Sequence, residues 1–166
     1  MSYYGTVTAA DSYHLARGNS AWTGADAVKE IALLRASEYL DARYESMFSG
    51  WPVNRRDQVR NWPRSNAFDI YDDAIPDDEI PVEVEYATYE LALVELVTPG
   101  KLTPTVVQAD RKKAVAVSGA VSVTYADALG IEAYRPVITA VDGILAPLLV
   151  SQSGSGSTLA GRIVRS

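Results

Sequence analysis

Two prolines in the middle of the chain, Pro63 and Pro81, limit where its helices can lie. Pro63 disfavours helical geometry at Trp62, so a short helical run over Arg55 to Asn61 must end there. Pro81 suits the first turn of a helix over Val82 to Val97, because its missing N–H would have no partner there in any case. That second helix is apolar on more than one side, which predicts that it is buried all round.

Helical signals recur on both sides of this segment. Thr23 followed by Asp26 resembles a capping box and predicts a helix from about Gly24 to Met47. Arg135-Pro136 predicts the start of a final helix, which Pro147 ends and which caps the core. By contrast, residues 1–21 show no sustained period, and they predict an N-terminal arm with one helical turn at Ala9 to Ala16.

The pattern changes after Pro104, where apolar residues alternate with a period of two. Ala114 to Val117 and Ala120 to Tyr125 are joined at Ser118-Gly119, which predicts a β-hairpin. From Ser151 the chain is rich in Gly and Ser, which predicts a flexible C-terminal arm.

The predicted fold is therefore mainly α. We expect a small helical bundle with a short β-hairpin insertion, at about residues 105–126, and extended N- and C-terminal arms. Residues 1–150 form the predicted helical domain and residues 151–166 the C-terminal arm.

Composition narrows the class of protein. A chain of 166 residues with 48% hydrophobic residues can bury one ordinary core. Its net charge of −6 argues against a general nucleic-acid coat, because phosphate binding is driven by Lys and Arg. The chain has no cysteine, which fits assembly in a reducing cytoplasm, and no apolar run long enough to span a bilayer. It begins without a signal-peptide pattern. We expect a protein without membrane partners that is not exported.

Catalytic and metal-binding patterns are absent from the sequence. His14 is the single histidine, and no nucleophile-elbow pattern accompanies it. A dense carboxylate loop lacks the glycine of a calcium-binding loop and is broken by Pro76, so a solvated acidic face is the preferred interpretation. That loop contains Asp69, Asp72, Asp73, Asp77, Asp78 and Glu79. We predict no enzymatic activity, no cofactor and no metal.

Basic and aromatic residues gather in one region of the chain. Arg55, Arg56 and Arg60 lie near Trp51 and Trp62, a combination that a single-stranded DNA platform needs. The alternative is that the tryptophans anchor the core or an interface, while the arginines pair with the acidic loop of the same or the next subunit. We prefer this alternative because the surrounding charge is acidic.

Apolar residues on a polar helix face raise the question of subunit contacts. Ile31 and Leu34 lie among acidic residues, either as ordinary surface residues or as contacts to a neighbouring subunit. The predicted subunit-interface candidates are Ile31, Leu34, Trp51, Trp62, Arg64, Tyr86 and Tyr89.

Several short sequence motifs follow one another in a characteristic order along the chain. They are Tyr4-Gly5-Thr6, Tyr13, Ala32 to Ala36 followed by Tyr39-Leu40, Gly50 before Gln58 to Arg64, Val123-Thr124-Tyr125, and Leu145 to Leu149. In this order and spacing, nearly the whole chain resembles the small head-to-tail adaptor (connector) proteins of long-tailed bacteriophages. Within them it is similar to the group labelled "putative DnaT-like single-stranded DNA binding protein".

The resemblance implies a structural virion protein of the neck, between capsid and tail, that is assembled in the host cytoplasm. Such a protein is a homo-oligomer, a ring of about twelve copies. It docks on the portal protein, offers its opposite face to a stopper or tail-completion protein, and lines a channel that DNA passes without specific binding. An acidic lumen would repel the phosphates and let the duplex slide.

The portal contact is predicted in the C-terminal arm, which regains apolar and basic residues at its end. The candidates are Leu159, Arg162, Ile163, Val164 and Arg165. A second function remains open, that of a single-stranded DNA-binding replication protein of the DnaT-like type, with Arg55, Arg56 and Arg60 as its site. A third is an oligomeric scaffold with another phage role.

Overall fold

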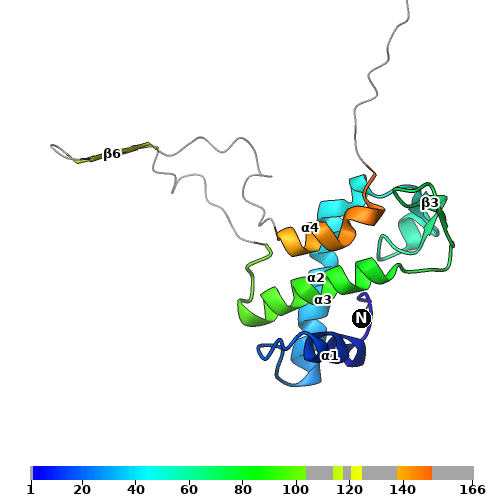
Figure 1. The fold of residues 1–166 in the computed structure, drawn as a ribbon, viewed down its shortest axis with the longest axis horizontal. Coiled ribbons are helices and arrows are strands. Elements are labelled where there is room, and N and C mark those ends of the chain that lie inside the picture. Colours follow the sequence, from blue (N-terminus) through cyan, green and yellow to red (C-terminus); the bar gives the residue numbers. More distant parts are fainter. Residues whose placement is uncertain (1, 104–113, 118–120, 125–137, 151–166) are drawn as a thin grey trace, which may run out of the picture.

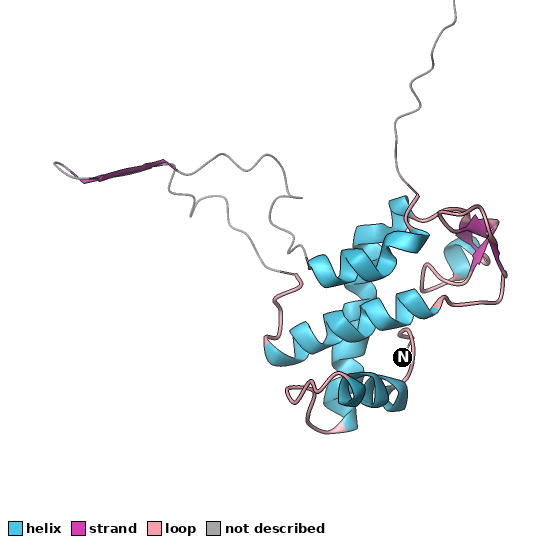
Figure 2. Cartoon of the chain, in the orientation of Figure 1, coloured by secondary structure: helices cyan, strands magenta, loops and turns pink. Residues whose placement is uncertain are grey.

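The computed structural model describes residues 2–103, 114–117, 121–124 and 138–150, and this part of the chain is mainly helical, as predicted. The helix α3 crosses α2, with α1 on one side of it and α4 on the other (Figures 1 and 2). Short 3₁₀ turns follow or connect these helices. The helical elements are α1 (Val7–Ala16), α2 (Asp26–Tyr44), η1 (Glu45–Met47), η2 (Arg55–Asp57), α3 (Val82–Val97), α4 (Thr139–Leu145) and η5 (Ala146–Leu148).

The strands of the described residues form antiparallel pairs. Within the loops between α2 and α3, β1 (Trp51–Pro52) pairs with β2 (Arg64–Ser65), and β3 (Ala67–Phe68) pairs with β4 (Ala74–Ile75). The longer strands β5 (Ala114–Val117) and β6 (Val121–Thr124) face each other in the register Val115 to Val123. The strands of the predicted hairpin are therefore confirmed.

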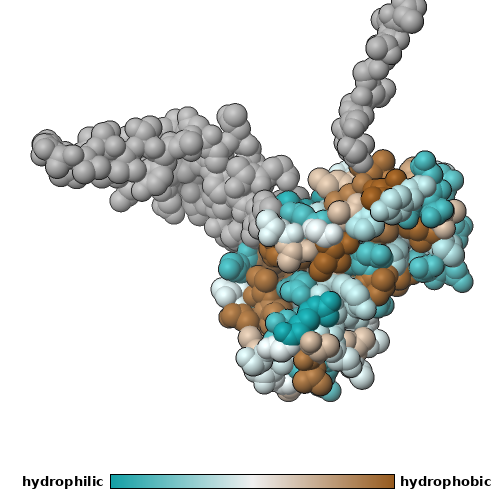
Figure 3. Space-filling model, in the orientation of Figure 1, coloured by the Kyte–Doolittle hydropathy of each residue, from teal (hydrophilic) through white to brown (hydrophobic). Residues whose placement is uncertain are grey.

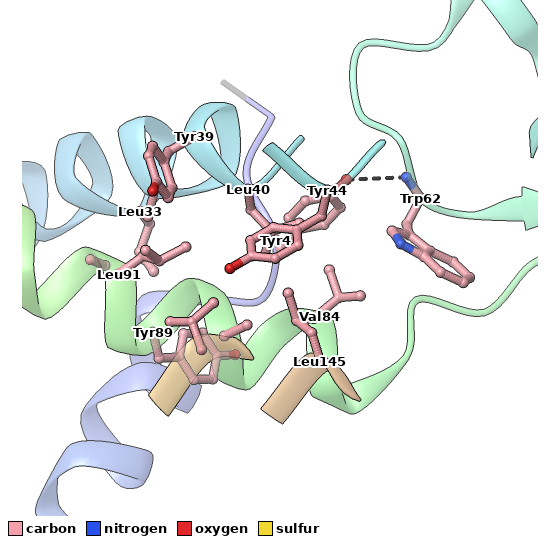
Figure 4. Packing of buried hydrophobic residues seen from close by; sticks show 14 of the residues in the cluster. Tyr4, Leu33, Tyr39, Leu40, Tyr44, Trp62, Val84, Tyr89, Leu91 and Leu145 are labelled. Atoms are coloured by element: carbon pink, nitrogen blue, oxygen red, sulfur yellow. Dashed lines mark hydrogen bonds between the residues drawn. The ribbon is translucent and has the colours of Figure 1, made fainter. Parts of the chain in front are cut away.

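The core lies where α2, α3 and α4 meet (Figure 4). Leu33 and Leu40 face it from α2, Leu91 from α3 and Leu145 from α4, and none of these four side chains is exposed. Their spacing follows from helical periodicity, which brings residues three or four apart onto one face. The predicted role of the last helix, to cap the core, agrees with its buried Val141 and Leu145. No described helix is long and apolar enough to cross a membrane.

The N-terminal segment differs from the prediction of an arm, which is wrong for residues 2–21. It forms the full helix α1, which Thr6 caps by accepting a hydrogen bond from the Ala9 N–H at 3.1 Å. Tyr4 and Tyr13 are buried in the core. The segment shows no aliphatic period because its buried face is made of tyrosine and histidine, which combine an apolar ring with a polar group that needs a partner.

The predicted helix boundaries are largely correct, with local exceptions. The helix α3 covers the predicted residues, but Val82 and Tyr86 on it are exposed, so it is not buried all round. The helix α2 begins after Ala25 without a side-chain cap, so the predicted capping box is not formed. Only η2 is helical within Arg55 to Asn61. The peptide bond between Trp62 and Pro63, which follows this run, is cis.

The predicted start of the last helix, at residues 135–137, lies outside the described residues.

His14 is buried and fully hydrogen-bonded at the contact between α1 and α3. Its Nε2 lies 3.2 Å from the carbonyl oxygen of Tyr89, so this nitrogen carries the proton, and its Nδ1 accepts from the amide of Asn19 at 3.0 Å. Burial lowers the pKa of His14, while the charge of Glu90 acts in the opposite direction. The folded protein thus holds His14 in its neutral form.

A pH dependence of stability follows. Because the pKa of His14 is lower in the folded chain than its ordinary value, the folded state binds fewer protons. The free energy of unfolding should therefore fall as the pH drops below about 6.5, and stop falling once the pH passes the folded pKa. Urea unfolding at pH 7.5 and pH 5.5 measures this. His14→Gln should remove most of the difference, since His14 is the single histidine; an unchanged difference would contradict the assignment.

Candidate functional site

The loop between α2 and α3 carries the three predicted DNA-binding residues and three of the predicted interface residues, and its backbone is held by a few specific contacts. Gly50, just before β1, adopts a φ of 64° and lies so close to the backbone of Ser65 and Asn66 that no side chain fits there. The amide of Gln58 donates to the carbonyls of Arg60 and Pro63 at 2.8 and 2.9 Å. These bonds fix the loop that presents Trp51 and η2 at the surface.

One basic and aromatic surface results, formed by Trp51, Val53, Arg55 and Arg56, which we call the Trp51–Arg56 surface. Trp51 is 40% exposed, and the Arg55 guanidinium lies 4.5 Å from the centroid of its ring. Arg56, the next residue in the sequence, is exposed as well. A flat exposed ring with a cation over it can stack on a base or on a partner's aromatic residue, and a second exposed cation adds positive charge to the surface.

Arg60, by contrast, is used inside the fold. It is 9% exposed, and its Nε donates to the carbonyl of Ser2 at 2.9 Å. Its guanidinium also lies 3.1 Å from the Asp41 carboxylate and 3.7 Å from that of Glu38. Burial raises the pKa of Asp41, and its bonds to Tyr4 and Arg60 oppose that shift. Arg60 therefore joins the N-terminus, α2 and the loop, and is not free to bind a phosphate.

Trp62 and Arg64 are likewise interior residues. The Trp62 side chain is 2% exposed and packs edge-on against Phe48, with ring centroids 5.4 Å apart, while its backbone N–H donates to the hydroxyl of Tyr4 (Figure 4). Arg64 is 3% exposed and donates to the carbonyls of Ser49 and Gly50, each at 2.8 Å. Burial lowers the pKa of its guanidinium. Both side chains hold the loop onto the body of this chain.

The remaining predicted interface residues fall into two groups. Ile31 and Tyr86 are exposed, at 46% and 38%, and Leu34 is half-buried. Tyr89 is 1% exposed, and burial raises its pKa to about 12. Ile31 and Tyr86 are thus available to a partner, whereas Tyr89 is part of the core.

Sequence reasoning missed an exposed apolar knob on the acidic loop. The β3–β4 tip, residues 69–73, presents Ile70 and Tyr71, which are 53% and 75% exposed. The Asp69 carboxylate accepts from the backbone N–H groups of Tyr71 and Asp73 at 2.8 and 3.0 Å. The N–H of Ile70 donates to the carbonyl of Pro147 at 2.9 Å. The order Asp-Ile-Tyr-Asp-Asp was the signal, because an aspartate often closes such a turn.

A hollow of about 430 Å³ lies beside α1, and polar side chains that line it are hydrogen-bonded to one another. The Asp11 carboxylate accepts from the indole N–H of Trp22 at 2.6 Å and from the Lys29 ammonium at 2.8 Å. The bond from Lys29 holds the pKa of Asp11 below its usual range. This network attaches α1 to the start of α2, and we therefore assign it a structural role.

Other predicted features lie elsewhere or outside the described part. In the described ranges, no group of three or more His, Cys, Asp or Glu side chains could hold a metal ion. On the face seen in Figure 3, apolar residues form several groups separated by polar ones. The portal-contact candidates Leu159, Arg162, Ile163, Val164 and Arg165 lie outside the described residues.

Comparison with known proteins gives one match. The family model described as "Putative DnaT-like ssDNA binding protein" matches residues 2–166. No curated protein and no solved structure matches the chain. The description agrees with the second of the functions considered from the sequence, single-stranded DNA binding, and the match says nothing about a head-to-tail adaptor.

Proposed function

The chain belongs to the family described as putative DnaT-like ssDNA binding proteins, and we propose that this member is a structural assembly protein, a head-to-tail adaptor of a bacteriophage. The observation that carries the proposal is the interior use of Arg60 and Trp62. Both are needed for an extended strand platform, which requires several cations and stacking rings at the surface. Here they hold the loop onto α2 and the N-terminal segment instead.

Charge and surface composition support the same proposal. The chain carries a net charge of −6, which opposes binding to a polyanion. Exposed apolar side chains such as Tyr71 and Ile31 fit contacts with protein partners better than contacts with phosphate. The order of sequence marks that resembles phage adaptors adds to these arguments.

In this role the protein makes and breaks no bond. Copies would assemble into a ring, dock on a portal and pass DNA through an acidic channel that repels phosphate. A single docking contact can be weak, because a ring engages its partner many times at once and gains from effective concentration. We therefore propose neither an enzymatic activity nor a cofactor.

A second function is favoured by a specific observation, the exposed pairing of Arg55 with Trp51 beside Arg56. Together with the family description, it supports single-stranded DNA binding. A base would stack on the indole while the two guanidinium groups approach its phosphates. The Trp51–Arg56 surface offers one indole and two guanidinium groups, so one copy would bind a strand weakly and with a shallow salt dependence.

One experiment separates the two functions. We expect the purified protein to co-sediment with its cognate portal and to show rings on it by negative-stain microscopy. We also expect no binding of labelled single-stranded oligonucleotides tighter than about micromolar at physiological salt, measured by fluorescence anisotropy. Submicromolar, sequence-independent binding that Arg55→Glu with Arg56→Glu abolishes, without portal association, would replace the adaptor by the DNA-binding function.

A further inference from the structure

We propose that the β3–β4 tip of one copy docks on the Trp51–Arg56 surface of a second copy of the same chain. The inference deepens the proposed structural function and rests on it. It assigns the partner of two surfaces that the fold exposes, and it uses the charges and rings that the described residues leave without an internal role.

The tip is built as a protruding contact. Ile70 and Tyr71 are more than half exposed, and Asp72 and Asp73 flank them at the surface. The bond from Ile70 to Pro147 attaches the tip to η5, and Asp69 closes the turn. The tip therefore presents two apolar side chains next to acidic groups. Because its backbone is already held in place, binding a partner would cost little further conformational entropy.

The receiving surface has the opposite character. Arg55 and Arg56 form no ion pair with any carboxylate in the described ranges, and the indole of Trp51 is 40% exposed. Tryptophan, tyrosine and arginine are the residues that most often anchor protein contacts. Tyr71 of the tip can pack on the Trp51 ring while Asp72 and Asp73 meet the two guanidinium groups.

A second copy fits this surface better than a nucleic acid does. The tip supplies an apolar ring together with the carboxylates, whereas a strand brings only bases and phosphates to a chain that is acidic overall. Within one chain the carboxylates of Asp72 and Asp73 form no ion pair among the described residues. A contact between two different surfaces is heterologous, and repeated contacts of that kind can close into a ring.

Charge reversal tests the pairing. Arg55→Glu with Arg56→Glu, and separately Asp72→Arg with Asp73→Arg, should each weaken self-association at least about tenfold, measured by sedimentation velocity at low salt. Mixing the two variants should restore association, because each then meets a complementary surface. Lys101→Glu, at another exposed position, serves as a control that should leave self-association unchanged.

Crosslinking keeps the proposal testable even if association is weak. The chain has no cysteine, so Arg56→Cys and Asp72→Cys introduce unique thiols. A short bis-maleimide should join the mixed variants into a heterodimer, whereas Arg56→Cys mixed with Ser12→Cys on α1 should not form one.

If mixing restores nothing and no crosslink forms while the wild type still assembles on the portal, the assigned surfaces are wrong and the adaptor function stands. If the crosslink forms but the protein binds DNA and not the portal, the pairing stands and the adaptor function fails.

Discussion

Replacing Trp62 with alanine is expected to lower the free energy of unfolding by about 3–5 kcal/mol, the usual range for removing a buried aromatic side chain. The indole is almost fully buried against Phe48, and its backbone N–H is bonded to Tyr4 from the N-terminal segment. A cavity at this point would loosen the loop, the N-terminal segment and η1 together. Urea unfolding followed by circular dichroism measures the change.

Trp51→Ala provides the matched control. It removes the same side chain from an exposed position of the same loop, so it should change the free energy of unfolding by less than about 1 kcal/mol. Equal effects of the two substitutions would show that Trp62 does not anchor the loop.

Gly50→Ala is expected to cost about 2–5 kcal/mol, because it adds strain of two kinds. The residue has a φ of 64°, which disfavours a side chain. In addition, a Cβ at Gly50 would lie 2.2 Å from the carbonyl oxygen of Ser65 and 2.6 Å from that of Asn66. These are backbone atoms, so the pairing of β1 with β2 would have to shift. A decrease in the unfolding midpoint in urea reports this cost.

Gly18→Ala separates the two kinds of strain. Gly18 has a similar φ of 68°, but a Cβ there would meet nothing within 4 Å. This variant should therefore show only the dihedral cost of about 1–2 kcal/mol. If Gly18→Ala destabilised the protein as much as Gly50→Ala, the close approach of the two strands would contribute nothing measurable.

The helices were predictable where aliphatic periodicity and proline signals agree. The bounds of α3 follow from Pro81 and the apolar stripe up to Val97, and the strands β5 and β6 follow from alternation. The prediction assigned only one helical turn to the α1 region, because its large buried residues are Tyr13 and His14. Their hydrogen bonds to α3 cannot be read from a period of 3.6. Tertiary contacts determined that helix.

The site was less predictable than the fold. Three arginines and two tryptophans are clustered in the sequence. In the structure, however, some of them lie at the surface and others in the interior. Arg55 and Trp51 are exposed, whereas Arg60 and Trp62 are buried by partners that lie far along the chain. No local sequence pattern shows which of these side chains is buried. Burial depends on Tyr4 and Asp41, and these residues come from segments that meet the loop only in the folded chain.

The packing of α4 on α3 has a consequence for how the length of this chain can vary. The two helices touch although the segment from Pro104 to Val137 separates them in sequence, so the core is closed across a long connection. Because α3 packs on α2 with one part of its surface and on α4 with another, a single residue inserted within α3 would rotate everything beyond the insertion by about 100° around the helix axis. Part of its buried face would then turn away from both neighbours.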